Sequence, residues 1–395
     1  MMRVLASVLP GTGHLLPLLP TLQALRGAGD TVLVASAEPL RAEVEAAGLD
    51  FTAVGPSWHE SDADALLPGF RAAGSVGQLG MFAELAPRVL PDLLILADEM
   101  RPHLLLREPY EFAAWLAAER TGLPMVVHAI GAISGSPVLF AALVGGPLSD
   151  ARLAAGLPAD PGLSTLYGRG MITSYPPSLR FLQLPPSEVP HQLIRLPMPA
   201  PAELPFERVR PGRPLVYVTL GTVFNTAVEL LRTLVEGVAG LDVEVVVTTG
   251  PTVDPATLGP QPAHVHAARY IAQQDVLAAA AAVVCHAGVG TVYGALSVGL
   301  ALVVAPLAAD QPICALGCVL AGAAASLSPV PPPQDVLAYV TDPTAVTAPQ
   351  VSEATTRVLE TPGYGEAARR IAAEIAAAPP PSSVRPWLTS LVDEV

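Results

Sequence analysis

The chain has 395 residues, which suits two domains at the usual size of roughly 100–200 residues each. Hydrophobic residues make up 51% and charged residues 14%, with 43 prolines and 33 glycines, so long apolar elements alternate with many turns and a disordered chain is excluded. The net charge is −14 and no basic cluster is present, which excludes nucleic acid as a favoured partner.

The first 36 residues predict a βαβ unit. Residues 2–9 predict a strand, PGTGH a turn, residues 15–28 a helix and residues 31–35 a second strand. His14 therefore follows the first strand at its carboxyl end, where open α/β sheets bind ligands. The residues alone leave an ordinary interpretation open, in which His14 caps the helix that follows.

The remainder of the first half is less regular. Residues 51–101 are apolar without a clear period, and we expect irregular structure there. Residues 101–129 then predict a strand, a turn that holds Glu108, a helix and a strand that ends near His128. Without further information, Glu108 is a solvated carboxylate beside Arg107. Residues 175–214 are too rich in proline for a helix or a central strand, so we place the interdomain linker there.

A second α/β domain follows the linker. The segment LVYVTLGT predicts a strand that ends in a loop of small residues, residues 226–237 predict a helix, and VEVVVTTG predicts another strand. Further on, HVHAARYIAQQDVLAAAA predicts a short strand, an exposed turn and a helix. This alternation of strands and helices is typical of a parallel sheet.

Residues 285–315, CHAGVGTVYGALSVGLALVVAPLAADQPICA, carry the densest pattern of glycines and polar side chains. An apolar strand leads to His286, a helix is predicted from Val289, and the strand ALVVAP precedes Asp310 and Gln311. Two consecutive strand ends thus deliver polar groups to one edge of the sheet. The bare backbone of the glycines would let a phosphate approach the amides of a helix N-terminus. The alternative is a core histidine flanked by turn glycines.

Two further features bear on location. The three cysteines Cys285, Cys314 and Cys318 give no even framework for disulfides, so we expect buried thiols in a reducing cytoplasm. Residues 276–309 contain no Asp, Glu, Lys or Arg, but glycines and Pro306 divide them. Buried strands and a helix explain this stretch better than a membrane span does.

The pieces HAGVGT, LSVGLALVVAP and DQPICA, in this order and spacing, resemble the donor-binding signature of GT-B nucleotide-sugar glycosyltransferases that act on lipophilic small molecules. Their bacterial natural-product branch is the most similar. The N-terminal SVLPGTGHLLPLLPTLQALRGAGDTVLVAS resembles the opening of the same family. The resemblance implies an α/β protein of the GT-B fold, with two doubly wound Rossmann-like domains that face a cleft. We assign residues 1–205 to acceptor binding, 206–375 to donor binding and 376–395 to a segment that returns to the N-terminal domain.

The resemblance also implies roles for individual residues. His14 would be the catalytic base and Glu108 the carboxylate that orients it. The donor diphosphate would contact Thr12, Thr219, Gly221, Thr222, His286, Gly288, Val289, Gly290 and Thr291. Tyr270 and Ile271 would bracket the nucleobase, and Asp310 and Gln311 would hold the sugar. Relatives usually have a proline where this chain has Ala272. Residues 51–101 and VLFAALVGGPL would line the acceptor pocket, with His128 as a weaker candidate for its wall.

The implied reaction is an inverting, metal-independent and cofactor-free transfer of a sugar or deoxysugar from a nucleoside diphosphate to a lipophilic acceptor in antibiotic biosynthesis. Plant enzymes that use uridine nucleotides carry a glutamate eight positions after the signature histidine, and here that position is Gly294. We therefore predict a deoxythymidine diphosphate (dTDP) donor. O- or C-glycosylation and a homodimer both stay open.

The alternatives are a catalytically silent glycosyltransferase-like auxiliary protein, a GT-B sugar-nucleotide epimerase and a lipid-linked cell-wall transferase. A nicotinamide-dependent dehydrogenase is excluded because PGTGHLLP lacks the G-x-G-x-x-G spacing.

Overall fold

The computed structural model describes residues 1–70, 72–132, 137–181, 190–221 and 227–393. The chain divides into two compact units. Unit 1 comprises Met1–Ser174, Gln183–Pro197 and Ala378–Val395, and unit 2 comprises Tyr175–Leu182 and Met198–Ala377. The chain thus passes between the units more than once within the proline-rich segment, and it returns to unit 1 at its C-terminal end.

Unit 1 is built on a parallel sheet of order β3-β2-β1-β4-β5-β6-β7. Its strands are β1 (Arg3–Ser7), β2 (Thr31–Ser36), β3 (Asp50–Ala53), β4 (Leu104–Arg107), β5 (Met125–His128), β6 (Gly170–Thr173) and β7 (His191–Leu193). The short β7 occupies an edge, where a neighbouring proline costs no ladder hydrogen bond. The order reverses direction between β1 and β4, which makes the carboxyl ends of these two strands a topological switch point.

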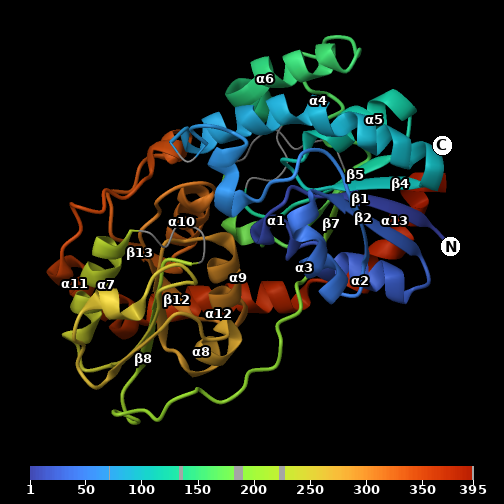
Figure 1. Ribbon diagram of the computed structural model, residues 1–395. Coiled ribbons are helices and arrows are strands. Elements are labelled where there is room, and N and C mark those ends of the chain that lie inside the picture. The colour runs from blue at the N-terminus through green and yellow to red at the C-terminus, as the bar shows by residue number, and fades with distance from the viewer. Residues whose placement is uncertain (71, 133–136, 182–189, 222–226, 394–395) are drawn as a thin grey trace. The chain divides into compact units, whose positions relative to one another are not determined.

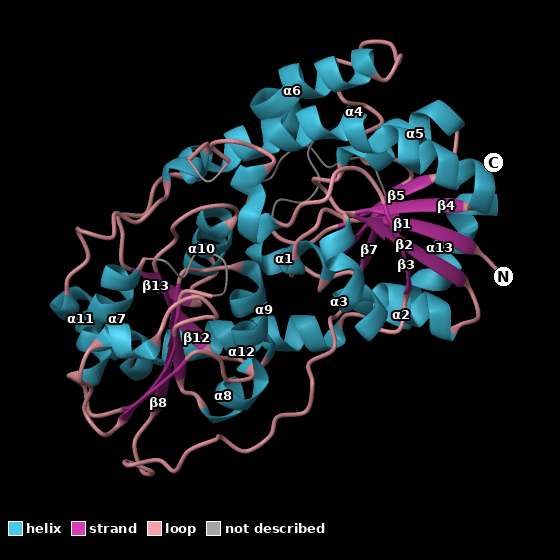
Figure 2. Ribbon diagram, viewed as in Figure 1, coloured by secondary structure: helices cyan, strands magenta, loops and turns pink. Residues whose placement is uncertain are grey.

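Helices cover both faces of this sheet, as Figures 1 and 2 show. They are α1 (Thr12–Leu15), α2 (Leu19–Gly27), α3 (Arg41–Ala46), α4 (Gly74–Met100), α5 (Phe112–Thr121), α6 (Pro137–Ala154) and α13 (Val384–Asp393), with 3₁₀ turns at Glu38–Leu40, Glu60–Ala65 and Pro381–Ser383.

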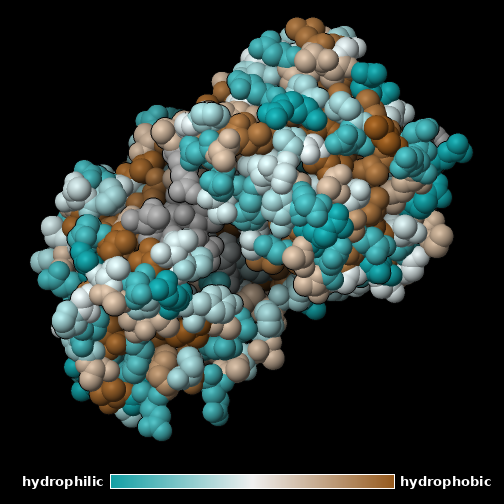
Figure 3. All heavy atoms as spheres, viewed as in Figure 1, coloured by the Kyte–Doolittle hydropathy of each residue, from teal (hydrophilic) through white to brown (hydrophobic). Residues whose placement is uncertain are grey.

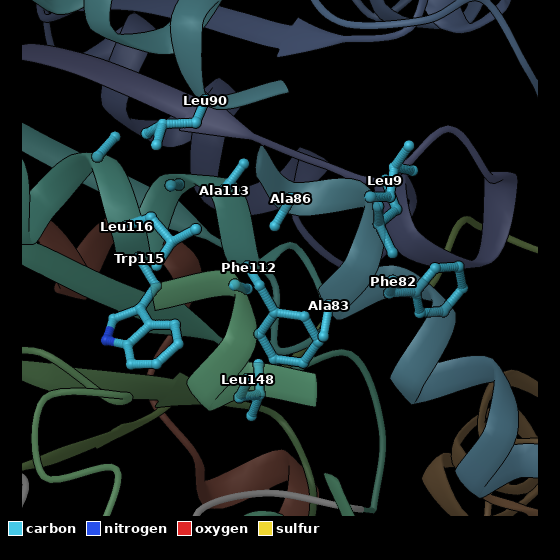
Figure 4. Close-up of a cluster of buried hydrophobic side chains, with 14 of the residues drawn as sticks. Leu9, Phe82, Ala83, Ala86, Leu90, Phe112, Ala113, Trp115, Leu116 and Leu148 are labelled. Atoms are coloured by element: carbon cyan, nitrogen blue, oxygen red, sulfur yellow. The ribbon is translucent and has the colours of Figure 1, made fainter. Parts of the chain in front are cut away.

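Alternating side chains of the strands divide the core of unit 1 between the two faces. In β1, Val4 and Ala6 pack with α2, α3 and α13, whereas Leu5 packs with α4, α5 and α6. The face that carries α4, α5 and α6 holds the rings of Phe112 and Trp115, and Figure 4 shows them near the aliphatic side chain of Leu148. This period of two is the pattern expected of a strand buried on both faces.

Two predictions for unit 1 were wrong. The turn expected at residues 10–14 contains the short helix α1. The helix expected over residues 15–28 is found as α2 but begins only at Leu19, because Pro17 has no N–H with which to continue α1. The expected irregular segment contains α4, a helix of 27 residues. Most of its buried residues follow a helical period, namely Leu79, Phe82, Ala83, Ala86, Leu90, Leu93 and Ala97, and Leu85 is buried as well. Pro87 and Pro91 obscure that period in the sequence, yet both lie inside the helix.

Unit 2 is a second parallel sheet, of order β10-β9-β8-β11-β12-β13. Its strands are β8 (Leu215–Thr219), β9 (Glu244–Thr248), β10 (Val265–Ala268), β11 (Ala282–Cys285), β12 (Ala301–Val304) and β13 (Ala324–Ser326). This is the order of a dinucleotide-binding sheet, and its switch point lies between β8 and β11. The sequence-based strands and helices of this half are confirmed in kind and order.

The helices of unit 2 are α7 (Val228–Ala239), α8 (Gln273–Ala279), α9 (Val289–Ser297), α10 (Gln311–Leu320), α11 (Ala348–Glu360) and α12 (Pro362–Ala377), with 3₁₀ turns at Pro177–Leu179, Pro255–Leu258 and Pro333–Ala338. In Figure 1, α7 and α11 lie on one side of the sheet and α8, α9 and α12 on the other. Residues 276–309 form β11, α9 and β12 and the end of α8 within this unit, and no membrane-spanning helix was found among the described residues.

Exposed apolar side chains are scattered among hydrophilic ones on the face that Figure 3 presents.

An ion pair fixes the C-terminal helix α13 to unit 1. Arg385 donates from Nε to Oδ2 of Asp30 at 2.7 Å and from Nη2 to Oδ1 at 3.0 Å. The same carboxylate accepts a hydrogen bond from the backbone N–H of Met2 at 2.8 Å.

Candidate active site

The switch point of unit 1 brings His14 and Glu108 together. His14 lies in α1, directly after β1, and Glu108 follows β4, the neighbouring strand. Nδ1 of His14 is 3.2 Å from Oε1 of Glu108, whose side chain is fully buried. The helix-capping interpretation of His14 is wrong, since Gly11 is the N-cap of α1 and no side chain caps it.

The interpretation of Glu108 as a solvated carboxylate beside Arg107 is also wrong. Arg107 is itself completely buried, and its Nη1 donates to the backbone oxygens of Glu108 and Pro109 at 2.9 and 2.8 Å. Oε2 of Glu108 accepts a hydrogen bond from the backbone N–H of Tyr110 at 2.7 Å. Arg107 thus fixes the turn, and the turn fixes the carboxylate against the imidazole.

Aromatic rings surround this pair. The imidazole of His14 contacts Phe82 and Tyr110 edge-on, with ring centroids 6.2 and 5.9 Å away. Phe82 in turn packs near Trp58 and Phe70. A histidine with one nitrogen facing a carboxylate and apolar rings around it can accept a proton from a bound hydroxyl group.

His128 does not belong to this wall. It is fully buried at the end of β5, and Nδ1 donates to the backbone oxygen of Ala129 at 3.0 Å, so Nε2 accepts from the hydroxyl of Thr21 at 2.9 Å. Burial lowers the pKa of His128 to about 4. It is a neutral core histidine, which corrects its assignment to the acceptor wall.

The hydroxyl of Thr12 is directed at a carboxylate, although a role in diphosphate binding was predicted for it. Its hydroxyl donates to the carboxylate of Glu43, 3.3 Å from each oxygen. A carboxylate at this place would repel a diphosphate, so the geometry gives no support to Thr12 as a diphosphate ligand.

The switch point of unit 2 brings Thr219, Gly221 and His286 together. Thr219 ends β8, and its Oγ1 accepts hydrogen bonds from Gly221 N–H at 3.1 Å and from the Thr248 hydroxyl at 2.9 Å. Thr222 lies outside the described residues. On the adjacent strand β11, His286 follows Cys285 and its ring lies against the loop after β8.

Two glycines make room for the His286 ring. A Cβ on Gly221 would lie 2.7 Å from its Cε1, and one on Gly288 would lie 2.3 Å from its Nε2. Burial lowers the pKa of His286 to about 4. Its ring is therefore neutral near pH 7 and offers a hydrogen bond without a positive charge.

The N-terminus of α9 is open for an anion. Its N-cap, Gly288, has no side chain, so the amides of the first turn, which includes Val289, Gly290 and Thr291, have no side-chain cap. A Cβ on Gly290 would meet no atom within 4 Å, which shows open space there. Such amides bind phosphate through hydrogen bonds and the helix dipole.

Strained backbone marks the loop after β11 and the loop after the neighbouring strand β12. Ala287, between His286 and Gly288, has φ 63°, and Ala309, before Asp310, has φ 55°. Residues other than glycine rarely adopt this left-handed region, and such strain concentrates at functional sites.

Asp310 and Gln311 begin α10. Gln311 is buried, and its Oε1 accepts hydrogen bonds from the N–H groups of Leu307 and Ala308 at 2.8 and 3.1 Å. Its oxygen therefore shapes its own loop. Asp310 is more accessible and has Cys314 Sγ 3.9 Å from its Oδ2.

The loop after β10 presents a tyrosine to solvent. Tyr270 is 73% exposed, whereas Ile271 is buried. Ala272 has φ −57°, a value that proline would also adopt, so the missing proline does not change the backbone here. An exposed ring on this loop is available to stack on a planar base.

Sequence reasoning missed Gln273. It is the first residue of α8, and its Nε2 is buried without a hydrogen-bond partner among the described residues. A Cβ on Gly294 would lie 3.1 Å from this nitrogen. The side chain of Gln273 thus fills space beside Gly294, and the signal in the sequence was its place three residues after Tyr270.

Comparisons with known proteins agree with this arrangement. Residues 23–145 match the N-terminal domain, and residues 232–391 the C-terminal domain, of the erythromycin biosynthesis protein CIII-like family. The chain is 35% identical over 329 residues to L-demethylnoviosyl transferase of Streptomyces niveus, which covers 78% of this chain and 81% of that protein.

Solved structures of glycosyltransferases are also similar to this chain. The glycosyltransferase SnogD from Streptomyces nogalater superposes with a TM-score of 0.76 at 27% identity and covers 99% of both chains. The glycosyltransferase VinC, solved in complex with dTDP, has a TM-score of 0.78 at 25% identity over 100% of both chains. The chain therefore belongs to the GT-B natural-product glycosyltransferases. It is a glycosyltransferase of antibiotic biosynthesis that transfers a sugar to a small-molecule aglycone.

Proposed function

We propose that this enzyme transfers a deoxysugar from a dTDP donor to a lipophilic aglycone with inversion at the anomeric carbon. The observation that carries the proposal is the His14–Glu108 pair at the switch point of unit 1, 3.2 Å between Nδ1 and Oε1. A carboxylate on Nδ1 holds the proton on that nitrogen and leaves Nε2 as the proton acceptor.

In the proposed reaction, Nε2 of His14 takes the proton of an acceptor hydroxyl group. The acceptor oxygen forms a bond to the anomeric carbon from the face opposite the diphosphate, and the electron pair of the broken carbon–oxygen bond goes to the diphosphate. An activated aromatic carbon could replace the hydroxyl oxygen and give a C-glycoside.

On the donor side, we assign the diphosphate to the amides at the start of α9 and to His286. The neutral His286 ring would donate a hydrogen bond to the leaving group, and the helix N-terminus would stabilise its charge. These donors support departure of the diphosphate without a metal ion.

For the donor nucleotide, we predict that a 2′-hydroxyl group is not required. Gly294 supplies no carboxylate for the ribose, and the adjacent Gln273 presents a buried amide nitrogen instead. In a competition assay, dTDP should bind more tightly than UDP, and dUDP at least as tightly as UDP. The dUDP/UDP comparison isolates the 2′-hydroxyl and the dTDP/dUDP comparison isolates the 5-methyl group. A clear preference for UDP over dUDP would refute this prediction.

For the sugar, we predict that Asp310 contacts hydroxyl groups and not the nucleotide, since a carboxylate near a diphosphate is repelled. Asp310→Ala should reduce kcat/KM for transfer while the Kd of dTDP stays within a few-fold of the native value. Asp310→Asn, which keeps the shape and removes the charge, is the matched variant. Equal losses of transfer and of dTDP binding would place Asp310 at the nucleotide instead.

A further inference from the structure

A second carboxylate, that of Glu60, lies beside His14. Oε2 of Glu60 is 4.0 Å from Nε2 of His14, whereas Glu108 faces Nδ1. The two carboxylates therefore face different nitrogens of one ring. The side chains of His14 and Glu60 are only 14% and 19% exposed, so water screens the pair incompletely.

The backbone holds Glu60 in this place. Its N–H donates to the backbone oxygen of Pro10 at 2.8 Å, which ties the 3₁₀ turn Glu60–Ala65 to the loop after β1. A Cβ on Gly11 would lie 2.4 Å from Oε2 of Glu60. The carboxylate thus occupies the space that a side chain at position 11 would fill.

We propose that Glu60 is a positioning residue that raises the basicity of His14 from the acceptor side. The inference rests on the proposed role of His14 as base. When Nε2 takes the proton of the acceptor, the ring becomes a cation between two carboxylates, and Glu60 stabilises that cation. The described groups that face the ring include these two carboxylates and the uncharged rings of Phe82 and Tyr110.

The direct test is an NMR titration of the imidazole of His14, with its signal assigned from a His14→Gln variant. Glu60→Gln should lower the titration midpoint of His14 by about 0.5–1 pH unit, as expected when an opposite charge about 4 Å away is removed. Asp62→Asn is the matched control, because it removes one negative charge from the same turn at an exposed position. An unchanged midpoint in Glu60→Gln, or an equal change in Asp62→Asn, would overturn the proposal.

A second variant moves the carboxylate without removing its charge. Gly11→Ala would push Glu60 away from the ring, so the midpoint of His14 should fall in the same direction. This arm keeps the net charge constant and separates local contact from the general field of the protein. A midpoint equal to that of the native enzyme would contradict the proposal.

Steady-state kinetics then test whether the effect of Glu60 on His14 contributes to catalysis. The acid limb of the kcat/KM profile should move to lower pH in Glu60→Gln by the same amount as the NMR midpoint, and an unmoved limb would overturn the inference. The NMR arm needs no turnover, so it distinguishes the two ideas. If His14→Ala retained full turnover while the NMR midpoint still shifted, the base assignment would fail and the coupling alone would stand.

Discussion

His14→Ala is expected to lower kcat by about 10²–10⁴-fold for an O-acceptor, the contribution typical of a positioned general base. The Kd of dTDP should barely move, because the residues assigned to the diphosphate and nucleobase, Thr12 excepted, belong to unit 2. Loss of an interaction made only in the transition state appears in kcat and kcat/KM together. Steady-state kinetics and a dTDP titration of the same preparation measure both quantities.

Glu108→Gln separates the base from its orienting partner. An amide nitrogen that faces Nδ1 would move the ring proton to Nε2, the wrong nitrogen for a base, so kcat should fall although His14 is intact. If the acceptor reacts through an aromatic carbon, the phenolate of its own ring supplies part of the driving force, and the loss in His14→Ala should be smaller. Unchanged turnover of His14→Ala on every acceptor would remove His14 from the chemistry.

The strands and their ends were the features that could be predicted from the sequence. Parallel strands buried on both faces read as continuous apolar runs, and the polar residue after each run marks the edge where ligands bind. The same pattern places His14, Glu108 and His286 at the carboxyl ends of strands. It depends only on the local order of apolar and polar residues and on the topology that parallel sheets share.

What the sequence did not reveal depends on long-range packing. The helix α4 was hidden by Pro87 and Pro91, because tertiary contacts of its apolar face outweigh the two lost hydrogen bonds. Glu60 lies 46 positions from His14 in the chain and carries no motif, so only the folded backbone brings it to the ring. The same holds for Gln273 and Gly294, which meet where α8 packs against α9.

Unit 1 also contains two buried titratable groups, His128 and Glu111, which should change its stability in opposite directions as the pH falls. His128 has its pKa lowered to about 4 by burial, so between pH 6.5 and 4 the unfolded chain binds a proton that the folded chain does not. Its contribution to stability is present at neutral pH and is lost as the pH falls through this window. Burial raises the pKa of Glu111 to about 7, so the folded chain holds the extra proton and stability is gained as the pH falls from 7 towards 4.5.

We therefore expect the effects of His128 and Glu111 on the pH dependence of the free energy of unfolding nearly to cancel in the native protein. Variants that remove one of the two groups should reveal the effect of the other. From pH 7.5 to 5, the free energy of unfolding of His128→Gln should rise relative to the native protein by about 2 kcal/mol, and that of Glu111→Gln should fall by about 2 kcal/mol. All three tryptophans, Trp58, Trp115 and Trp387, lie in unit 1, so their fluorescence in urea titrations reports on this unit. His286→Gln, in unit 2, is the control that should leave these midpoints unchanged. Parallel pH profiles for the native protein and His128→Gln would show that His128 is protonated in the folded state, against its burial between Thr21 and Ala129.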